Sequence, residues 1–214
     1  MPAPPDPRAW AGRWNAAGVE RRAAGDWRGA LAAFLRAAEA DPSLPEPYAN
    51  AAALFLRAGD VPRARRAASH ALALAPAHPV AAPVSALAAA LLGARAPTAA
   101  ILAPFSAGEL ALFALSAARS GHALPAASVV RRALETRGEA PALLFAAAVL
   151  SAACGDLRTA AWFAARLVDP TARGALESLL ASNGDADLAG IAEAVAEHLA
   201  AADRETPHAR FYAR

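Results

Sequence analysis

Lysine is absent from this 214-residue chain, and cysteine occurs once, as Cys154. Every residue of the Lys and Arg class is therefore Arg. This bias, together with abundant Ala, Pro and Gly, is typical of a bacterial genome rich in G and C. A single cysteine excludes an intramolecular disulfide and a thiolate metal cluster. Because Cys154 is next to a turn glycine on an apolar helix, we expect an inert, buried thiol.

Aromatic residues are few, at 6% of the chain, and alternating runs of Val, Ile and Thr are missing. The sequence therefore predicts no β-sheet. Apolar runs are also short. Residues 80–94 are interrupted by Pro83, and the uncharged stretch 140–155 contains Pro141, so both fall short of a membrane span. We expect 140–155 to form a buried helix.

No leader sequence is evident at the N-terminus, because Met1–Pro7 lacks the charged region and apolar run of a signal peptide. We interpret residues 1–10 as a disordered lead and expect a cytoplasmic protein. The net charge of +2 is too small to indicate a nucleic-acid partner.

Catalytic motifs are missing as well. The five histidines are scattered, and none forms a metal-ligand pair at helical or zinc-finger spacing. No phosphate-binding glycine loop and no nucleophile elbow occurs. We therefore expect a protein that is not an enzyme by itself and has no metal or cofactor site.

Regularly spaced glycines are the most informative feature that is present. Gly25 and Gly59 are 34 residues apart, and so are Gly121 and Gly155. Three of the four are followed by Asp, which suits the N-cap of a next helix, while Gly suits the end of the previous one. Other matched residues also recur at this interval: Trp14 with Tyr48, Ala30 with Ala64, Ala37 with Ala71, and Pro42 with Pro76.

These residues resemble the tetratricopeptide repeat (TPR) family. The run Trp14, Gly18, Gly25-Asp26, Ala30, Phe34, Ala37 and Pro42 fits the family pattern closely, and the run from Tyr48 through Phe55 and Gly59 to Pro76 fits nearly as well. The resemblance implies an all-α, right-handed solenoid of antiparallel helix pairs. It also implies protein–protein scaffolding, with an inner groove lined by the first helix of each pair.

The interval from Gly59 to Gly121 is too short for two full repeats, so one repeat in the middle is degenerate. The expected organisation has five parts after the lead: two well-formed repeats at 11–78, a degenerate repeat at 79–106, two weaker repeats at 107–170, C-terminal capping helices at 171–204, and a tail at 205–214. Ser106 and Glu109 form a predicted capping box. A last helix at 186–203 would place Leu188, Ile191, Val195 and Leu199 on one face and acidic residues on the other.

Six residues are candidates for the groove wall. Arg57 and Arg119 stand two residues before turn glycines, Arg22 stands three before, and Asn15, Asn50 and Glu46 are expected nearby. Arg can bind carboxylates through two parallel hydrogen bonds, which favours an acidic peptide or a C-terminal carboxylate as ligand. Alternatively, these Arg residues only complement the negative end of a helix. Some members of the TPR family bind the C-terminal tails of chaperones through a carboxylate clamp. The resemblance disfavours that ligand here, because the clamp needs Lys and this chain has none.

Other groups have simpler interpretations. The Arg runs at Arg63, Arg65 and Arg66 and at Arg131 and Arg132 are expected on solvated outer faces. Trp10 and Trp14 share a helix face and are expected to seal the first repeat.

Two functions fit this pattern best, and a third, weaker interpretation is self-assembly through the exposed ends of the array. The preferred one is an adaptor that binds a peptide or helix of a partner protein in its concave groove. The alternative is the N-terminal repeat region of a larger bacterial enzyme, such as a glycosyltransferase.

Overall fold

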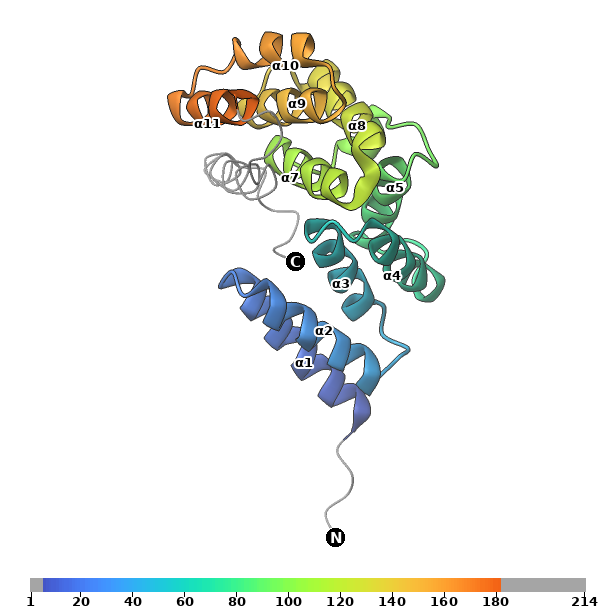
Figure 1. Cartoon of the computed structure of the whole chain (residues 1–214). Helices are drawn as coiled ribbons and strands as arrows, with labels where there is room; N and C mark the ends of the chain where they lie inside the picture. The colour runs from blue at the N-terminus through green and yellow to red at the C-terminus, as the bar shows by residue number, and fades with distance from the viewer. Residues whose placement is uncertain (1–5, 182–214) are drawn as a thin grey trace. The chain divides into compact units, whose positions relative to one another are not determined.

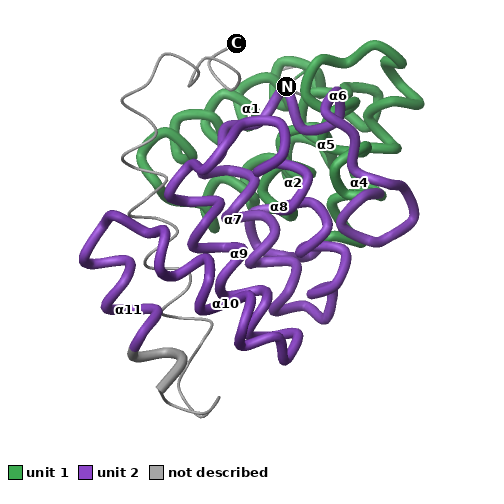
Figure 2. Tube along the Cα trace, turned by 90° about the horizontal axis from the view of Figure 1, so that it is seen from above, with its two compact units in different colours: residues 1–56, 61–88 green, residues 57–60, 89–214 purple. Residues whose placement is uncertain are grey.

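The computed structural model describes residues 6–181, which form helices joined by turns (Figure 1). No strand occurs within these residues, so the all-α prediction is confirmed. The predicted helix at 186–203 and the tail at 205–214 lie outside the described residues. The chain divides into two compact units, one of residues 1–56 and 61–88 and the other of residues 57–60 and 89–214 (Figure 2).

The first unit is built from two complete helix pairs and most of a fifth helix. Its helices are α1 (Pro7–Ala23), α2 (Trp27–Ala40), α3 (Pro45–Arg57), α4 (Val61–Leu74) and α5 (Ala81–Leu91), of which Arg57 and residues 89–91 belong to the second unit. The connections between paired helices are three residues long or close to it, a length that favours antiparallel neighbours.

The start of α1 corrects one prediction. Residues 7–10, expected in a disordered lead, are the first turn of this helix. Pro7 stands at a position where the missing amide hydrogen costs nothing, and the Asp6 side chain accepts a hydrogen bond from the Arg8 amide at 3.1 Å. The proline-rich N-terminal sequence therefore includes the start of a helix.

Small residues allow the helices of the first unit to approach closely. Gly18 in α1 faces the fully buried ring of Phe34 in α2, and a Cβ atom at Gly18 would lie 2.5 Å from that ring. Phe34 and Ala30 also pack with Ala51 and Leu54 of α3. A second cluster joins Ala49, Ala71 and Ala81, one from each of α3, α4 and α5. Alanine and glycine therefore set the helix spacing, as the composition suggested.

The turn glycines take the left-handed conformation that the sequence predicted. Gly25, Gly59, Gly121 and Gly155 have φ angles of +81°, +80°, +90° and +81°. Gly93 also has a positive φ, +71°, and it lies 34 residues after Gly59. Sequence inspection missed this third glycine of the register. The shortening of the degenerate repeat therefore falls after Gly93, between it and Gly121.

The second unit follows with shorter and less regular elements. They are α6 (Ala99–Leu102), α7 (Ala107–Ala117), a short π-helical segment η1 (Ala118–His122), α8 (Ala123–Arg137), α9 (Pro141–Ala153), α10 (Leu157–Ala164) and α11 (Pro170–Ala181). The chain leaves helical geometry at Ser120 and Gly121, where the predicted turn lies. Helix α10 ends at Ala164, four residues before the expected end, because the chain turns at Ala165 and Arg166 and then runs irregularly to α11.

Side chains close the ends of the short helix α6. Thr98 caps its start by accepting from the Ile101 amide, and the Arg137 guanidinium at the end of α8 donates to the carbonyl oxygens of Leu102 and Ala103 at 2.8 and 3.2 Å. The next helix, α7, begins with the predicted capping box. Ser106 Oγ accepts from the Glu109 amide at 3.1 Å, and the Glu109 carboxylate accepts from the Ser106 amide at 2.8 Å.

Helix α9 is the centre of the second unit. Residues 142–150 are all buried, and the helix contacts α7, α8, α10 and α11. The expectation of a buried helix in the apolar stretch 140–155 is confirmed. A helix that is apolar on all sides needs neighbours on all sides.

Candidate binding surface on the first helices

A chain of polar side chains links α1 to α3, the first helices of two successive pairs. The Arg22 guanidinium donates to Asn50 Oδ1 at 3.5 Å, the long limit of a hydrogen bond, and Asn50 Nδ2 donates to Asn15 Oδ1 at 3.1 Å. All three side chains are half-buried. The sequence placed these residues on one wall, and the structure brings them into contact.

The direction of these bonds determines what the network can offer a ligand. Arg22 can only donate, so Asn50 presents its oxygen to Arg22 and its amide nitrogen to Asn15. Asn15 consequently accepts through its oxygen and keeps its NH₂ group as a donor. Within residues 6–181, that NH₂ group has no acceptor. The network therefore ends in a hydrogen-bond donor, which suits a carboxylate or a backbone carbonyl.

Local sequence explains how α3 positions Asn50. Its neighbours Ala49, Ala51, Ala52 and Ala53 are all buried, so small side chains surround the one polar group on this stretch. Glu46 lies one helical turn before Asn50 but is exposed, and it forms no hydrogen bond or ion pair with any described residue. The structure thus leaves Glu46 outside the network that was expected to include it.

Arg57 and Arg119 belong to the second unit, whereas Arg22 belongs to the first. Arg57 is half-buried at the end of α3, just before the turn that contains Gly59, and Arg119 is exposed in η1. This turn packs tightly, because a Cβ atom at Gly59 would lie only 2.4 Å from the Ser116 carbonyl oxygen. The turn that follows Arg57 therefore has no room for a side chain at position 59.

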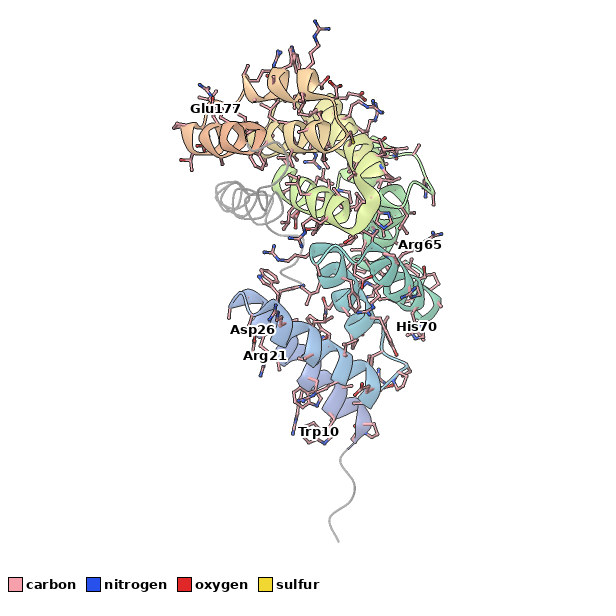
Figure 3. All side chains as sticks on the ribbon, in the orientation of Figure 1. Trp10, Arg21, Asp26, Arg65, His70 and Glu177 are labelled. Carbon is pink, nitrogen blue, oxygen red and sulfur yellow. The ribbon has the colours of Figure 1, made fainter. Side chains whose placement is uncertain are left out.

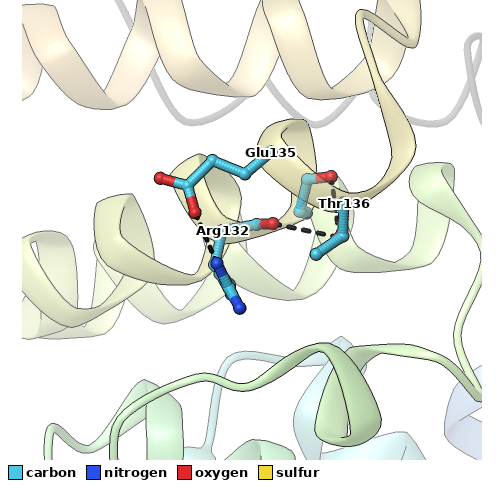
Figure 4. A network of polar contacts seen from close by, with 4 residues as sticks. Arg132, Glu135 and Thr136 are labelled. Atoms are coloured by element: carbon cyan, nitrogen blue, oxygen red, sulfur yellow. Dashed lines mark hydrogen bonds and ion pairs between the residues drawn. The ribbon is translucent and has the colours of Figure 1, made fainter.

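The remaining charged groups lie on outer faces. Arg63, Arg65, Arg66, Arg131 and Arg132 are all exposed, as expected. Arg21 and Asp26 form an ion pair, 3.4 Å apart, where α1 turns into α2 (Figure 3). Arg132 forms a shorter pair with Glu135 at 2.8 Å, and the Thr136 hydroxyl donates to the Arg132 carbonyl oxygen at 3.0 Å (Figure 4). Such exposed pairs contribute little to stability.

Two predictions about burial were wrong. Trp10 is 39% exposed, because it stacks on Trp14 with ring centroids 6.4 Å apart at the open edge of α1 and so does not seal a core. Arg13 and Arg36 lie over the Trp10 and Trp14 rings, respectively. Cys154 is exposed rather than buried, because it occupies the C-cap of α9, where the helix turns toward solvent.

His78 performs a structural role that the sequence did not indicate. Its Nδ1 atom accepts hydrogen bonds from the Val80 and Ala81 amides, at 3.2 and 3.3 Å, where α5 begins. Burial lowers the pKa of His78, and the Glu46 carboxylate opposes this shift. Only a deprotonated Nδ1 can accept, so the geometry also favours neutral imidazole.

Asp156 caps α10 in the same way that Asp26 caps α2. Its side chain accepts from the Thr159 amide at 3.0 Å, and the hydrogen bonds from Thr159 hold the pKa of this carboxyl below its usual value. No cluster of potential metal ligands occurs among the described residues. None of the described helices has the length and apolar character to cross a membrane.

Antiparallel helix pairs, left-handed glycines at a 34-residue interval and tight packing of small residues together define a tetratricopeptide-like helical repeat. Searches with the sequence against protein-family models and against curated proteins find no match.

Solved structures with a similar fold include TPR proteins of low sequence identity. One is TTC0263, a thermophilic TPR protein of Thermus thermophilus, which is 22% identical with a TM-score of 0.46 over 81% of this chain and 98% of its own. A mutant form of MamA is 18% identical, with a TM-score of 0.42 over 72% of this chain and 92% of its own. The pilF protein of Pseudomonas aeruginosa is 15% identical, with a TM-score of 0.44 over 96% of both chains.

Proposed function

We propose that this protein is a scaffold that binds an extended segment of another protein along its first helices. The observation that carries the proposal is the directed network from Arg22 through Asn50 to Asn15, which ends in an amide donor without an acceptor among residues 6–181. This half-buried donor is available to a ligand, so a ligand oxygen at Asn15 would accept a hydrogen bond there.

The chemistry of the candidate residues favours a ligand with carboxylates. Arg22 is part of the network, and Arg57 and Arg119 occupy comparable places, just before turn glycines. Asparagine amides suit the backbone of an extended peptide, while guanidinium groups suit its acidic side chains or its C-terminus. We expect moderate affinity that falls as ionic strength rises, because exposed charges are screened by salt.

The test begins with the identification of a partner. Immobilised full-length protein would capture proteins from an extract of its source cells, and mass spectrometry would identify them. The affinity of the best-enriched partner for the wild type would then be measured by fluorescence anisotropy at low ionic strength. Two variants follow: Arg57→Glu, which reverses the charge, and Arg57→Gln, which removes it with less change of shape.

Loss of a charge-assisted contact at Arg57 should weaken binding by about 1–3 kcal/mol. Arg131→Glu is the matched control, because Arg131 is an exposed Arg on a second helix, away from the proposed surface. Circular dichroism would check that each variant remains helical. Equal affinity of the wild type and both Arg57 variants would show that Arg57 is only a helix-end charge, and the proposed binding mode would fail there.

A further inference from the structure

Asn15, Val19 and Arg22 share one face of α1, because helical residues three and four positions apart are neighbours on the surface. The Asn15 NH₂ group has no acceptor within residues 6–181, and the Val19 side chain is 37% exposed. Gly12, one turn before Asn15, continues this face toward the start of the helix and is exposed as well. We call Gly12, Asn15, Val19 and Arg22 the α1 strip.

The glycine of this strip is not explained by the structure of α1 itself. Gly12 lies inside the helix without a positive φ, so its backbone conformation does not require glycine. Packing does not require it either. A Cβ atom at Gly12 would meet nothing within 4 Å, whereas one at Gly18 in the same helix would lie 2.5 Å from the Phe34 ring. Since glycine is among the least favourable residues inside a helix, Gly12 lowers the stability of α1 and leaves its surface open.

The spacing along the strip fits an extended chain. A helix rises about 1.5 Å per residue, so Asn15 and Arg22 lie about 10 Å apart along the axis of α1. Three residues of an extended chain also span about 10 Å. A ligand carbonyl that accepts from Asn15 and a ligand carboxylate beside Arg22 would therefore be about three residues apart. A ligand side chain between them would contact Val19.

We propose that an extended segment of a partner protein lies along the α1 strip, with its backbone passing over Gly12. One backbone carbonyl accepts from Asn15, an aliphatic side chain packs on Val19, and a carboxylate lies near Arg22. The partner segment accordingly has an aliphatic residue one or two positions from Asp, Glu or its C-terminus. This inference rests on the proposed function, and it adds the ligand motif and the position at which the ligand backbone approaches α1.

A random peptide library displayed on phage would supply the probe. Immobilised full-length protein should enrich peptides that pair an aliphatic residue with an acidic residue one or two positions away. A fluorescein-labelled synthetic peptide of the enriched sequence would then be titrated with the wild type and with variants, and fluorescence anisotropy would give each dissociation constant.

Substitution of Gly12 tests the approach of the ligand backbone. Gly12→Leu should raise the dissociation constant at least about tenfold, because the leucine side chain occupies the space of the ligand. Gly174→Leu is the matched control. Gly174 is also exposed inside a helix, with nothing within 4 Å of an added Cβ atom, but it lies in α11, outside the strip. Gly12→Ala should raise the melting temperature by about 2–4 °C and yet weaken binding, a combination that a merely structural role would not produce.

Substitution of Asn15 tests the hydrogen bond. Asn15→Asp keeps an oxygen that can accept from Asn50 Nδ2 but removes the NH₂ donor, so the dissociation constant should again rise at least about tenfold. Ala16→Asp is the control for charge. It adds a carboxylate at the next, exposed residue, about 100° around the helix, and should have a much smaller effect.

The outcomes separate this inference from the function on which it rests. A library that yields no enriched peptide would contradict both. Enriched peptides that bind Gly12→Leu as tightly as the wild type would overturn the inference alone, and weaker binding of the same peptides to Arg57→Glu would show that the proposed function still holds. Equal losses in Gly12→Leu and Gly174→Leu, equal losses in Asn15→Asp and Ala16→Asp, or an enriched sequence without the aliphatic and acidic residues would also overturn the inference.

Discussion

Two turn glycines differ in what surrounds them, although their backbone conformations are the same. Gly25 and Gly59 have φ angles of +81° and +80°, but a Cβ atom at Gly25 would meet nothing within 4 Å, whereas one at Gly59 would meet the Ser116 carbonyl at 2.4 Å. Positive φ requires glycine at both positions. Close packing requires it only at Gly59.

Alanine substitution should separate the two effects. Gly25→Ala should destabilise the protein by about 1–2 kcal/mol, the cost of an L-residue in the left-handed region. Gly59→Ala should cost about 1–3 kcal/mol more, because the backbone of α7 at Ser116 must also move. Urea denaturation followed by circular dichroism measures both, and Gly59→Val should be worse still. Equal losses for the two alanine variants would mean that the Gly59 turn does not pack on Ser116.

At the scale of one element, the start of α5 should depend on pH through His78. Burial lowers the pKa of this imidazole in the folded protein, and its Nδ1 accepts two amide hydrogens only when deprotonated. The unfolded state therefore binds the proton more readily. Stability from this group is fully present above the unfolded pKa, about 6.5, and is lost as pH falls from there through the lower pKa of the folded protein.

Thermal melts between about pH 5 and pH 8 would measure this dependence. His78→Asn keeps an acceptor at the same place without a titrating group, so its melting temperature should change less than that of the wild type across the range. His70→Asn is the control, because His70 is exposed and packs only against the Tyr48 ring. A pH dependence that is the same in His78→Asn and the wild type would exclude His78 as its source.

Elements with strong local signals could be predicted from the sequence. Gly-Asp turns, the Ser106 capping box and the apolar run of α9 are each indicated by a few neighbouring residues. The start of α1 at Pro7 could not be predicted, since proline suits both a helix start and an irregular segment. Gly93 was missed because the residue after it is Ala rather than Asp, although its spacing was correct.

The candidate site was less predictable than the fold for a physical reason. Repeat spacing predicts which residues share a face, and it grouped Arg22, Asn50 and Asn15. It does not predict which side chains reach one another, so Glu46 was included although it lies outside the network. The roles of His78 and Arg137 depend on hydrogen bonds to backbone atoms, for which the sequence gives no signal.

On the scale of the whole molecule, each unit has its own buried aromatic anchor. Phe34 in the first unit and Phe145 in the second are both fully buried. Each helical repeat contacts mainly the repeats next to it in sequence. A substitution should therefore lower local stability most in the helices near the altered residue.

Truncation of either ring to alanine should cost about 3–5 kcal/mol. Hydrogen exchange read out by mass spectrometry should show faster exchange in α1–α4 for Phe34→Ala and in α7–α11 for Phe145→Ala. Each variant is the control for the other. Uniform acceleration along the chain in both variants would mean that the protein opens only as a whole.

The closure of α6 also has a practical consequence. Between Gly93 and Gly121 the chain is shorter than a full repeat, yet the 34-residue spacing resumes from Gly121 to Gly155. Thr98 and Arg137 close the short helix locally. Residues 93–96, which precede it, are exposed. This connection is therefore where a reporter, such as a small epitope or a dye-binding peptide, could be inserted without disturbing the repeats on either side.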